Sequence, residues 1–287
     1  MQTPVQSRHA SVFPLSGPAT RGPGGSKWLR QRRESRVLRW WRHGASATAE
    51  GGLSERPQMK DSDHELQGRD PDLYYSLRKH HYRDDSIASG YDSLRFGGRR
   101  ARRNAAKWRA VKGALDHAGD VQTILDIPTG TGRFVPHLAN EGYTVVGSDI
   151  SREMMLVGRE KVGKLDESRI SFAQCDGERL PFRDGTFDCV MTIRFLFHLT
   201  PEARVNVLRE FGRVTRRWVL ADYRHRYSLR YLKQAAGYRL GLRGPVEPRV
   251  SRSEMNRELE AAGLQVCRIF RIAPLFSDKW VVLCERG

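Results

Sequence analysis

The stretch from Thr123 to Gly132, TILDIPTGTG, constrains the fold of this chain more than any other. Its first half is a short apolar run that holds a carboxylate, Asp126, near its end, and its second half is a tight turn with Gly130 and Gly132. Residues 134–139 then place apolar side chains on one side of a helix. This order is typical of an α/β sheet that presents backbone N–H groups and a helix N-terminus to a ligand.

A second apolar run, Tyr143 to Asp149, completes one strand–helix–strand unit and again ends in a carboxylate. Asp126 and Asp149 are 23 residues apart, which fits one such unit with the second acid placed for ribose hydroxyls. An NAD-dependent oxidoreductase shares this kind of turn, but it would have a third glycine where this chain has Val135. It also would not need Asp126. The pattern therefore predicts a nucleoside-containing cofactor at the carboxyl ends of the first two strands.

Several motifs, in order, give the chain a resemblance to a known family. They are Asp126–Gly132 (DIPTGTG), Tyr143–Asp149, Cys175–Glu178 (CDGE), Leu180–Phe187 (LPFRDGTF) and Phe187–Met191 (FDCVM). In them the chain resembles the class I S-adenosylmethionine-dependent methyltransferases of the small UbiE-like kind, over roughly residues 82–286. One departure is Pro128, which stands where the first glycine of the family usually stands and restricts φ at that turn position.

The resemblance implies a fold, a cofactor and a set of binding residues. The fold would be a Rossmann-like, seven-stranded, mostly parallel α/β sheet with a C-terminal antiparallel hairpin and helices on both faces. The cofactor would be S-adenosyl-L-methionine, with Asp149 at its ribose hydroxyls and Asp176 beside the adenine amino group. The expected cofactor-binding residues are Asp126, Pro128, Gly130, Gly132, Arg133, Asp149, Ile150, Met154, Asp176, Gly177 and Arg194.

Arg194 and His198, in the stretch RFLFH after the fourth strand, are the candidate catalytic residues. This loop faces the edge of the sheet where ligands bind in open α/β folds. His198 is the candidate general base because imidazole titrates near neutral pH, and a structural role in orienting the loop stays open. Arg194 suits bidentate recognition of an anionic acceptor group, with a bridge to an acid on the next helix as the alternative. No metal is expected, because displacement at a sulfonium needs none.

The chain lacks the Asn/Asp-Pro-Pro-aromatic motif of N-methyltransferases that act on nucleic acids and protein amides. Cys189 follows an acid inside a strand rather than a proline in a loop, which argues against a cysteine-dependent pyrimidine methylase. These features favour a small-molecule or lipid-like methyl acceptor. The alternatives are an RNA-directed methyltransferase that uses the basic surface and a non-catalytic RNA-binding protein on the same fold.

The formal net charge of +17 permits contact with nucleic acid or an anionic membrane. The 50 Lys and Arg residues are spread along the whole chain, so a generally basic surface is the alternative. The four cysteines lie in or beside apolar runs and lack C-x-x-C spacing, which predicts buried free thiols and a reducing, cytoplasmic location. The sequence predicts no oligomeric state.

The chain divides into three parts. Residues 1–70 are a basic, low-complexity tail predicted to be disordered, with an organelle-targeting leader or a membrane- or RNA-binding helix as alternatives. Residues 71–120 are predicted to form a helical lid, with Tyr82 and Tyr91 as candidate pocket residues. Residues 121–287 would be the core, with a basic, tyrosine-rich helical insertion at 223–250 on the substrate side. No apolar run is long enough to span a membrane.

Overall fold

A computed structural model describes residues 99–163, 168–242, 249–273 and 277–287. The predicted tail, the first part of the predicted lid with Tyr82 and Tyr91, and residues 243–248 of the predicted insertion lie outside the described residues. The strands are β1 Thr123–Asp126, β2 Thr144–Asp149, β3 Ile170–Gln174, β4 Phe187–Thr192, β5 Thr215–Arg224, β6 Leu264–Arg271 and β7 Lys279–Arg286. The α-helices are α5 Arg99–Ala118, α6 Val135–Asn140, α7 Arg152–Val162, α8 Pro201–Val214, α9 Leu229–Arg239 and α10 Arg252–Ala261, and η1 Leu196–His198 is a 3₁₀ turn.

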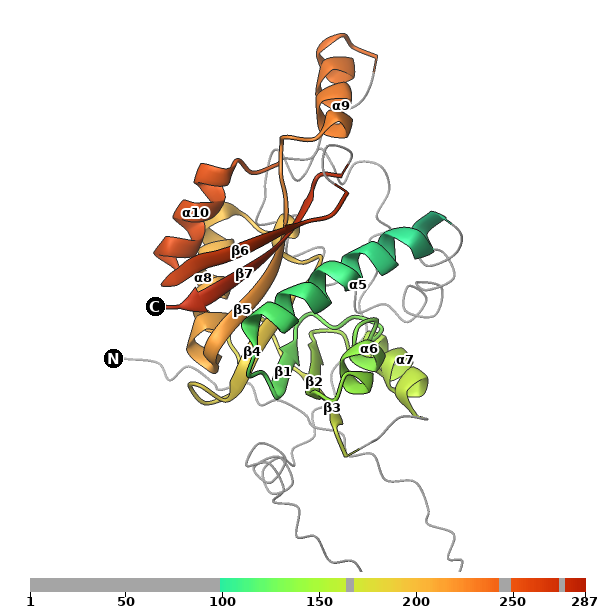
Figure 1. Cartoon of the computed structure of the whole chain (residues 1–287), viewed down its shortest axis with the longest axis vertical. Coiled ribbons are helices and arrows are strands. Elements are labelled where there is room, and N and C mark those ends of the chain that lie inside the picture. Colours follow the sequence, from blue (N-terminus) through green and yellow to red (C-terminus); the bar gives the residue numbers. More distant parts are fainter. Residues whose placement is uncertain (1–98, 164–167, 243–248, 274–276) are drawn as a thin grey trace, which may run out of the picture.

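The strands form one sheet in the order β3-β2-β1-β4-β5-β7-β6 (Figure 1). Strands β1 to β5 run parallel to one another, whereas β7 runs antiparallel to both β5 and β6. The predicted seven-stranded, mostly parallel sheet with an antiparallel end is confirmed. The strand order reverses between β1 and β4, so the loops after these two strands border the crevice where open α/β sheets bind ligands.

Helices cover both faces of the sheet, as predicted (Figure 1). One apolar cluster joins the sheet to α5, α6 and α7 and includes Leu115 and Leu138. The other joins the opposite face to α8 and α10 and includes Phe211 and Leu259. The sheet is therefore buried on both sides, which explains why its central strands are nearly continuous apolar runs.

The described part of the predicted lid is a layer of the core. Helix α5 contacts β5, β6 and β7 along one side. Its buried residues Val111, Ala114, Leu115 and Ala118 recur at helical spacing and form the stripe that faces the sheet. This part of segment 71–120 therefore packs on the sheet rather than over the crevice.

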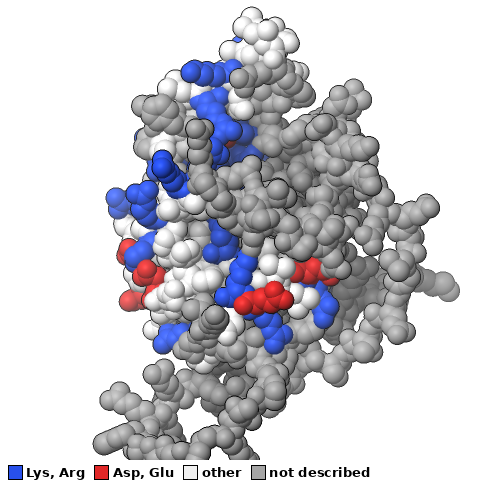
Figure 2. Space-filling view, turned by 90° about the vertical axis from the view of Figure 1, so that its right-hand side faces the viewer, with Lys and Arg blue, Asp and Glu red and all other residues white. Residues whose placement is uncertain are grey.

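Two boundaries near the predicted insertion differ from the prediction. The apolar run RWVLA at residues 217–221 predicts the fifth strand there, but β5 follows the last residue of α8 directly and continues to Arg224. Tyr223 is thus a buried strand residue and not part of the insertion helix. That helix is α9, which begins at Leu229, buries none of its residues and stands away from the sheet (Figure 1). Lys and Arg gather on this upper part of the molecule (Figure 2).

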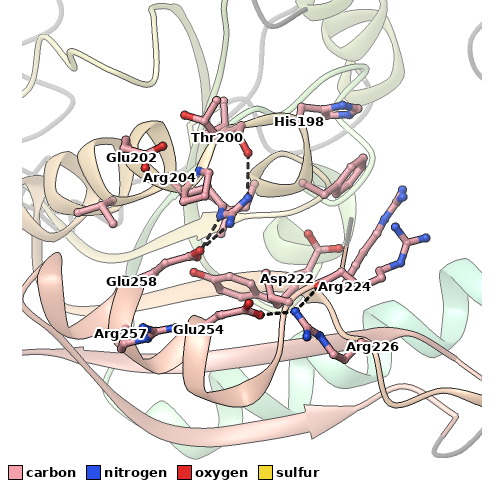
Figure 3. Close-up of a pocket in the computed structure, with 18 residues that line it drawn as sticks. His198, Thr200, Glu202, Arg204, Asp222, Arg224, Arg226, Glu254, Arg257 and Glu258 are labelled. Atoms are coloured by element: carbon pink, nitrogen blue, oxygen red, sulfur yellow. Dashed lines mark hydrogen bonds and ion pairs between the residues drawn. The ribbon is translucent and has the colours of Figure 1, made fainter. Parts of the chain in front are cut away.

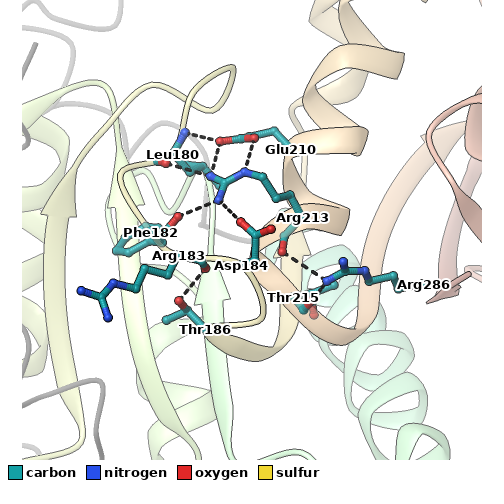
Figure 4. Close-up of polar contacts among 9 residues, drawn as sticks. All are labelled: Leu180, Phe182, Arg183, Asp184, Thr186, Glu210, Arg213, Thr215 and Arg286. Atoms are coloured by element: carbon teal, nitrogen blue, oxygen red, sulfur yellow. Dashed lines mark hydrogen bonds and ion pairs between the residues drawn. The ribbon is translucent and has the colours of Figure 1, made fainter. Parts of the chain in front are cut away.

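The link between β3 and β4 is held by Arg213 at the end of α8 (Figure 4). Its guanidinium donates to the carbonyl oxygens of Leu180 at 3.0 Å and Phe182 at 2.8 Å. It also pairs with Glu210 at 2.7 Å and Asp184 at 2.7 Å. A single side chain therefore ties a turn-rich loop to the helix layer.

The cysteine prediction holds for three of the four residues. All four thiols are free, and Cys175, Cys189 and Cys284 are buried. Cys267 is exposed, contrary to the prediction, because β6 is the edge strand and its register shifts at this residue. Within the described ranges, no helix has the length and apolar character needed to cross a bilayer.

Candidate active site

The turn after β1 is shaped by two glycines with left-handed backbone angles. Gly130 has φ of 56° and Gly132 has φ of 66°, a region that L side chains rarely adopt. The Gly130 N–H donates to Asp149 Oδ2 at 2.8 Å, so the turn is tied to the end of β2. A Cβ on Gly130 would meet nothing within 4 Å, which leaves this side of the turn open to a ligand. A Cβ on Gly132 would lie 3.1 Å from the Cα of Gly158 on α7, so this glycine serves helix packing.

Asp149 ends β2 and is only 6% exposed. Its second oxygen accepts from the Ser151 N–H at 3.0 Å. Burial raises the pKa of Asp149 to about 6, although the backbone hydrogen bonds act to lower it. A carboxylate has about four lone-pair sites, more than the backbone N–H groups of Gly130, Ser151 and Ile150 occupy, so Asp149 can still accept from a ligand hydroxyl. Such a side chain, beside an open glycine turn, fits the ribose of a nucleoside cofactor.

Asp126 lies deeper, at the end of β1, and accepts a hydrogen bond from Thr129 Oγ1 at 2.9 Å. Burial raises the pKa of Asp126 to about 7, although the positive charge of Arg133 acts in the opposite direction. The Arg133 guanidinium stacks over the Phe134 ring at 4.2 Å. Pro128 begins the turn with a cis peptide bond. The predicted residues of this first motif are therefore gathered around the turn.

The residues predicted for the adenine side lie at the ends of β2 and β3. Asp176 is half-buried and accepts from the Glu178 N–H at 3.1 Å. A Cβ on Gly177 would lie 3.5 Å from the Phe195 ring, which brings the loops after β3 and β4 together. Ile150 accepts from Gln174 Nε2 at 3.0 Å, and Met154 is buried in the first turn of α7. The structure thus places these residues along the same edge as Asp149.

Arg194 lies at the end of β4 with an unusual φ of 68° for a residue other than glycine. Its backbone N–H donates to Asp222 Oδ1 at 2.6 Å. The other oxygen of Asp222 forms a buried ion pair with Lys107 of α5. The predicted acid on the next helix is not among the described partners of Arg194, and the acid that holds its backbone belongs to β5 instead.

Lys107 and Asp222 lie at the edge of the candidate site and were not among the residues predicted from the sequence. Burial lowers the pKa of Lys107 despite the attraction of Asp222. Burial alone would raise the pKa of Asp222, but the Lys107 ammonium lowers it on balance. The available signal was a lysine on the apolar stripe of a helix, four residues before Val111. Its partner is 115 residues away in the chain, so the pairing was not visible in the sequence.

His198 borders a cavity of about 770 Å³ between η1, α8, α10 and the end of β5 (Figure 3). The ring of His198 packs against Phe197 with centroids 4.1 Å apart. The apolar lining comprises Leu196, Phe197, Leu199, Pro201, Val205, Tyr223 and Val250. The cavity is therefore large enough for a small organic molecule, and His198 is the candidate catalytic residue that lines it.

Arginines and acids alternate around the rest of this cavity (Figure 3). Arg204 forms two hydrogen bonds with Glu258, at 2.9 and 2.5 Å, and Arg226 pairs with Glu254 at 2.7 Å. The Arg224 guanidinium lies 3.5 Å from the centre of the Phe197 ring. Apolar and cationic surfaces thus meet beside His198. Among the described residues, no group of three or more His, Cys, Asp or Glu side chains is arranged to hold a metal ion.

Fold and site together define a nucleoside-cofactor enzyme core in which a glycine turn and two buried acids meet at the switch point of the sheet. Residues 124–217 match a protein family described as a methyltransferase domain. A demethylmenaquinone methyltransferase of Beutenbergia cavernae is 32% identical over 174 residues, which cover 58% of this chain and 62% of that protein. A ubiquinone/menaquinone biosynthesis C-methyltransferase UbiE of Haemophilus ducreyi is 35% identical over 102 residues, covering 32% of this chain and 39% of that protein.

The fold also matches a solved structure, the magnesium protoporphyrin IX methyltransferase ChlM of Synechocystis PCC 6803 with bound SAH. The TM-score is 0.56 at 17% identity, covering 73% of this chain and 99% of the other, which supports the fold alone. This chain spans less than two thirds of the length of the two curated relatives. The methyltransferase domain at residues 124–217 and these relatives support a class I S-adenosylmethionine-dependent methyltransferase of the UbiE-like kind, with S-adenosylmethionine as its cofactor.

Proposed function

We propose that this protein transfers a methyl group from S-adenosylmethionine to a small, lipid-like acceptor bound in the cavity beside His198. The observation that carries the proposal is the position of this cavity, which lies at the carboxyl ends of β4 and β5 and has a mainly apolar lining. The curated relatives, named as menaquinone and ubiquinone methyltransferases, support an acceptor of this kind. No described feature favours a nucleic acid acceptor over a small molecule.

The residues at the glycine turn would hold the cofactor. Asp149 would accept hydrogen bonds from the ribose hydroxyls, Asp176 would lie at the adenine, and the open side of Gly130 leaves room for the methionine part. When bound, S-adenosylmethionine supplies a methyl group already activated by a positive sulfur. The protein's task is then to align the acceptor and exclude water, which is the larger part of catalysis for a reaction of this kind.

His198 and Arg194 would serve the acceptor side. His198 lines the cavity and would take a proton from an acceptor whose attacking atom starts protonated. Arg194 would be held in place by Asp222 through its backbone, which leaves its side chain to meet a negatively charged acceptor group. Both roles are assigned to positions at the end of β4, beside the cofactor edge.

Calorimetry with S-adenosylhomocysteine on the wild type and on Asp149→Ala tests the cofactor site. We expect micromolar-range binding and a loss of at least about tenfold, about 1.4 kcal/mol, in the variant. Methyl transfer is then assayed with a prenylated hydroquinone and with RNA as acceptors. Turnover of the hydroquinone that His198→Ala reduces supports the proposal. RNA-dependent turnover without hydroquinone turnover contradicts it.

A further inference from the structure

Exposed apolar side chains of the described surface are concentrated on one segment, Tyr227 to Leu242. Of the seven large apolar residues that are strongly exposed, six lie in this segment and the seventh is Leu156. The exposed fraction is 47% for Leu229, 55% for Leu232, 71% for Leu240 and 76% for Leu242. A monomeric soluble protein rarely gathers so many apolar side chains in one place unless the patch binds something.

The apolar residues of this segment form a stripe along α9. Leu229, Leu232, Ala236 and Leu240 follow each other at spacings of three or four residues, so they share one side of the helix or its continuation. All four are exposed, and the helix buries none of its residues against the core. The helix also stands clear of the sheet (Figure 1).

The positive charge of the segment favours an anionic partner. From Tyr223 to Leu242 the chain has five Arg or Lys residues and no Asp or Glu. Arg230, Lys233 and Arg239 of α9 are exposed and form no ion pair with other described residues. Figure 2 shows Lys and Arg around this upper part of the molecule, whereas Asp and Glu lie lower.

A stripe of leucines flanked by cations that have no ion-pair partner among the described residues fits the surface of an anionic lipid bilayer. The leucines would enter the boundary between headgroups and acyl chains, and the cations would meet the lipid phosphates. A nucleic acid would use the cations but gain little from the leucines. A second copy of this chain would bring the same cations into contact, and like charges repel. We propose that α9 docks this protein onto an anionic membrane surface through Leu229, Leu232 and Leu240.

This docking would orient the cavity beside His198. Arg226 lines that cavity and is only two residues from Ser228, which caps α9. The membrane contact and the cavity are thus joined by a short stretch of chain. The docking does not depend on the proposed methyl acceptor, because it is measured without cofactor or acceptor.

Flotation of the full chain with vesicles tests the proposal. Vesicles contain phosphatidylcholine alone or phosphatidylcholine mixed with phosphatidylglycerol. We expect binding to the mixed vesicles, weak binding to the neutral ones, and weakening at high ionic strength. The double variant Leu232→Gln/Leu240→Gln should bind at least about tenfold more weakly. Lys233→Gln should weaken vesicle binding about fivefold, because it removes one positive charge near the membrane surface.

Leu156→Gln is the matched control, since Leu156 is exposed on α7 and lies outside the stripe. It should bind vesicles as the wild type does. Thermal unfolding checks that each variant is folded, which we expect because α9 buries nothing. Three outcomes overturn the proposal: no binding of the wild type to anionic vesicles, undiminished binding of the leucine variant, or a leucine variant that instead changes the molar mass measured by light scattering.

Discussion

At the scale of single residues, the two turn glycines separate stability from cofactor binding. In Gly132→Ala the new Cβ would lie 3.1 Å from backbone on α7 at a φ of 66°, so both strain and crowding act. We expect the free energy of unfolding to fall by about 2–3 kcal/mol. In Gly130→Ala the Cβ meets nothing, so the cost should be about 1–2 kcal/mol from the left-handed backbone alone.

In the same Gly130→Ala variant, the free energy of cofactor binding should weaken by more than the free energy of unfolding falls, because the new Cβ projects into the open side of the turn. Urea unfolding gives the stabilities and calorimetry with S-adenosylhomocysteine gives the affinities. Equal destabilisation of the two variants would contradict the crowding at Gly132. Wild-type affinity in Gly130→Ala would show that the open side of the turn is not the cofactor side.

The site residues that could be predicted from the sequence are those that lie close to one another along the chain. Asp126, Gly130, Gly132 and Asp149 belong to one strand–turn–helix–strand unit, so their proximity followed from local pattern. The Lys107–Asp222 pair joins α5 to β5, and only the packed fold brings such residues together. The exposure of Cys267 was missed for a related reason, because strand order decides which apolar strand becomes an edge.

At the scale of elements, Arg213 holds the loop between β3 and β4, and we predict that it contributes more to the free energy of unfolding than a surface ion pair does. Its guanidinium donates to two backbone carbonyls and pairs with Glu210 and Asp184. We expect Arg213→Ala to lower the free energy of unfolding by about 2–3 kcal/mol, because the carbonyls lose their charged donor. Urea unfolding measures the loss.

Arg217→Ala serves as the control for this loop prediction. Arg217 forms a surface bridge with Glu285, and its side chain is 60% exposed, so its removal should cost no more than about 1 kcal/mol. Similar losses in the two variants would mean that the Arg213 contacts contribute no more than a surface pair.

The buried Lys107–Asp222 pair is predicted to behave as a coupled unit that joins α5 to β5. Asp222→Asn leaves an acceptor for the Arg194 N–H but removes the counter-ion of a buried ammonium. Breaking such a pair from one side typically costs about 3–5 kcal/mol. The double variant Lys107→Met/Asp222→Asn should lose less than the sum of the single variants. Additive losses in a double-mutant cycle would contradict this coupling.

Elements were predicted well wherever the pattern was periodic and local. Helix α8 begins at Pro201, and α10 begins with the capping box of Ser251 and Glu254; proline in the first turn and the Ser-x-x-Glu spacing are both local patterns typical of helix starts. Strand β5 was predicted too short at both ends, because its outer residues gain their strand geometry from pairing with β4 and β7. Pairing of that kind depends on tertiary contacts rather than on local preference.

At the scale of the whole molecule, pH is predicted to move stability and cofactor affinity in opposite directions. Burial raises the pKa of Asp126 to about 7 and that of Asp149 to about 6, above the ordinary value of 3.8. Between about pH 4 and pH 7 the folded state therefore binds more protons at these two groups than the unfolded state does. Their contribution to the free energy of unfolding is largest at the acidic end of this window and falls as pH rises.

Cofactor affinity should run the other way, because Asp149 accepts ribose hydroxyls best as a carboxylate. Below about pH 6 the affinity for S-adenosylhomocysteine should fall by up to about tenfold per pH unit. Burial lowers the pKa of His137 and of His225, and both imidazoles affect stability in the opposite sense. The comparison with Asp149→Asn therefore separates the effect of the Asp149 carboxyl from that of the other titrating groups. In calorimetry from about pH 5 to pH 8, this variant should bind S-adenosylhomocysteine weakly and with little pH dependence. Wild-type affinity that stays constant across this range, or a variant that keeps the wild-type slope, would remove Asp149 from the ribose site.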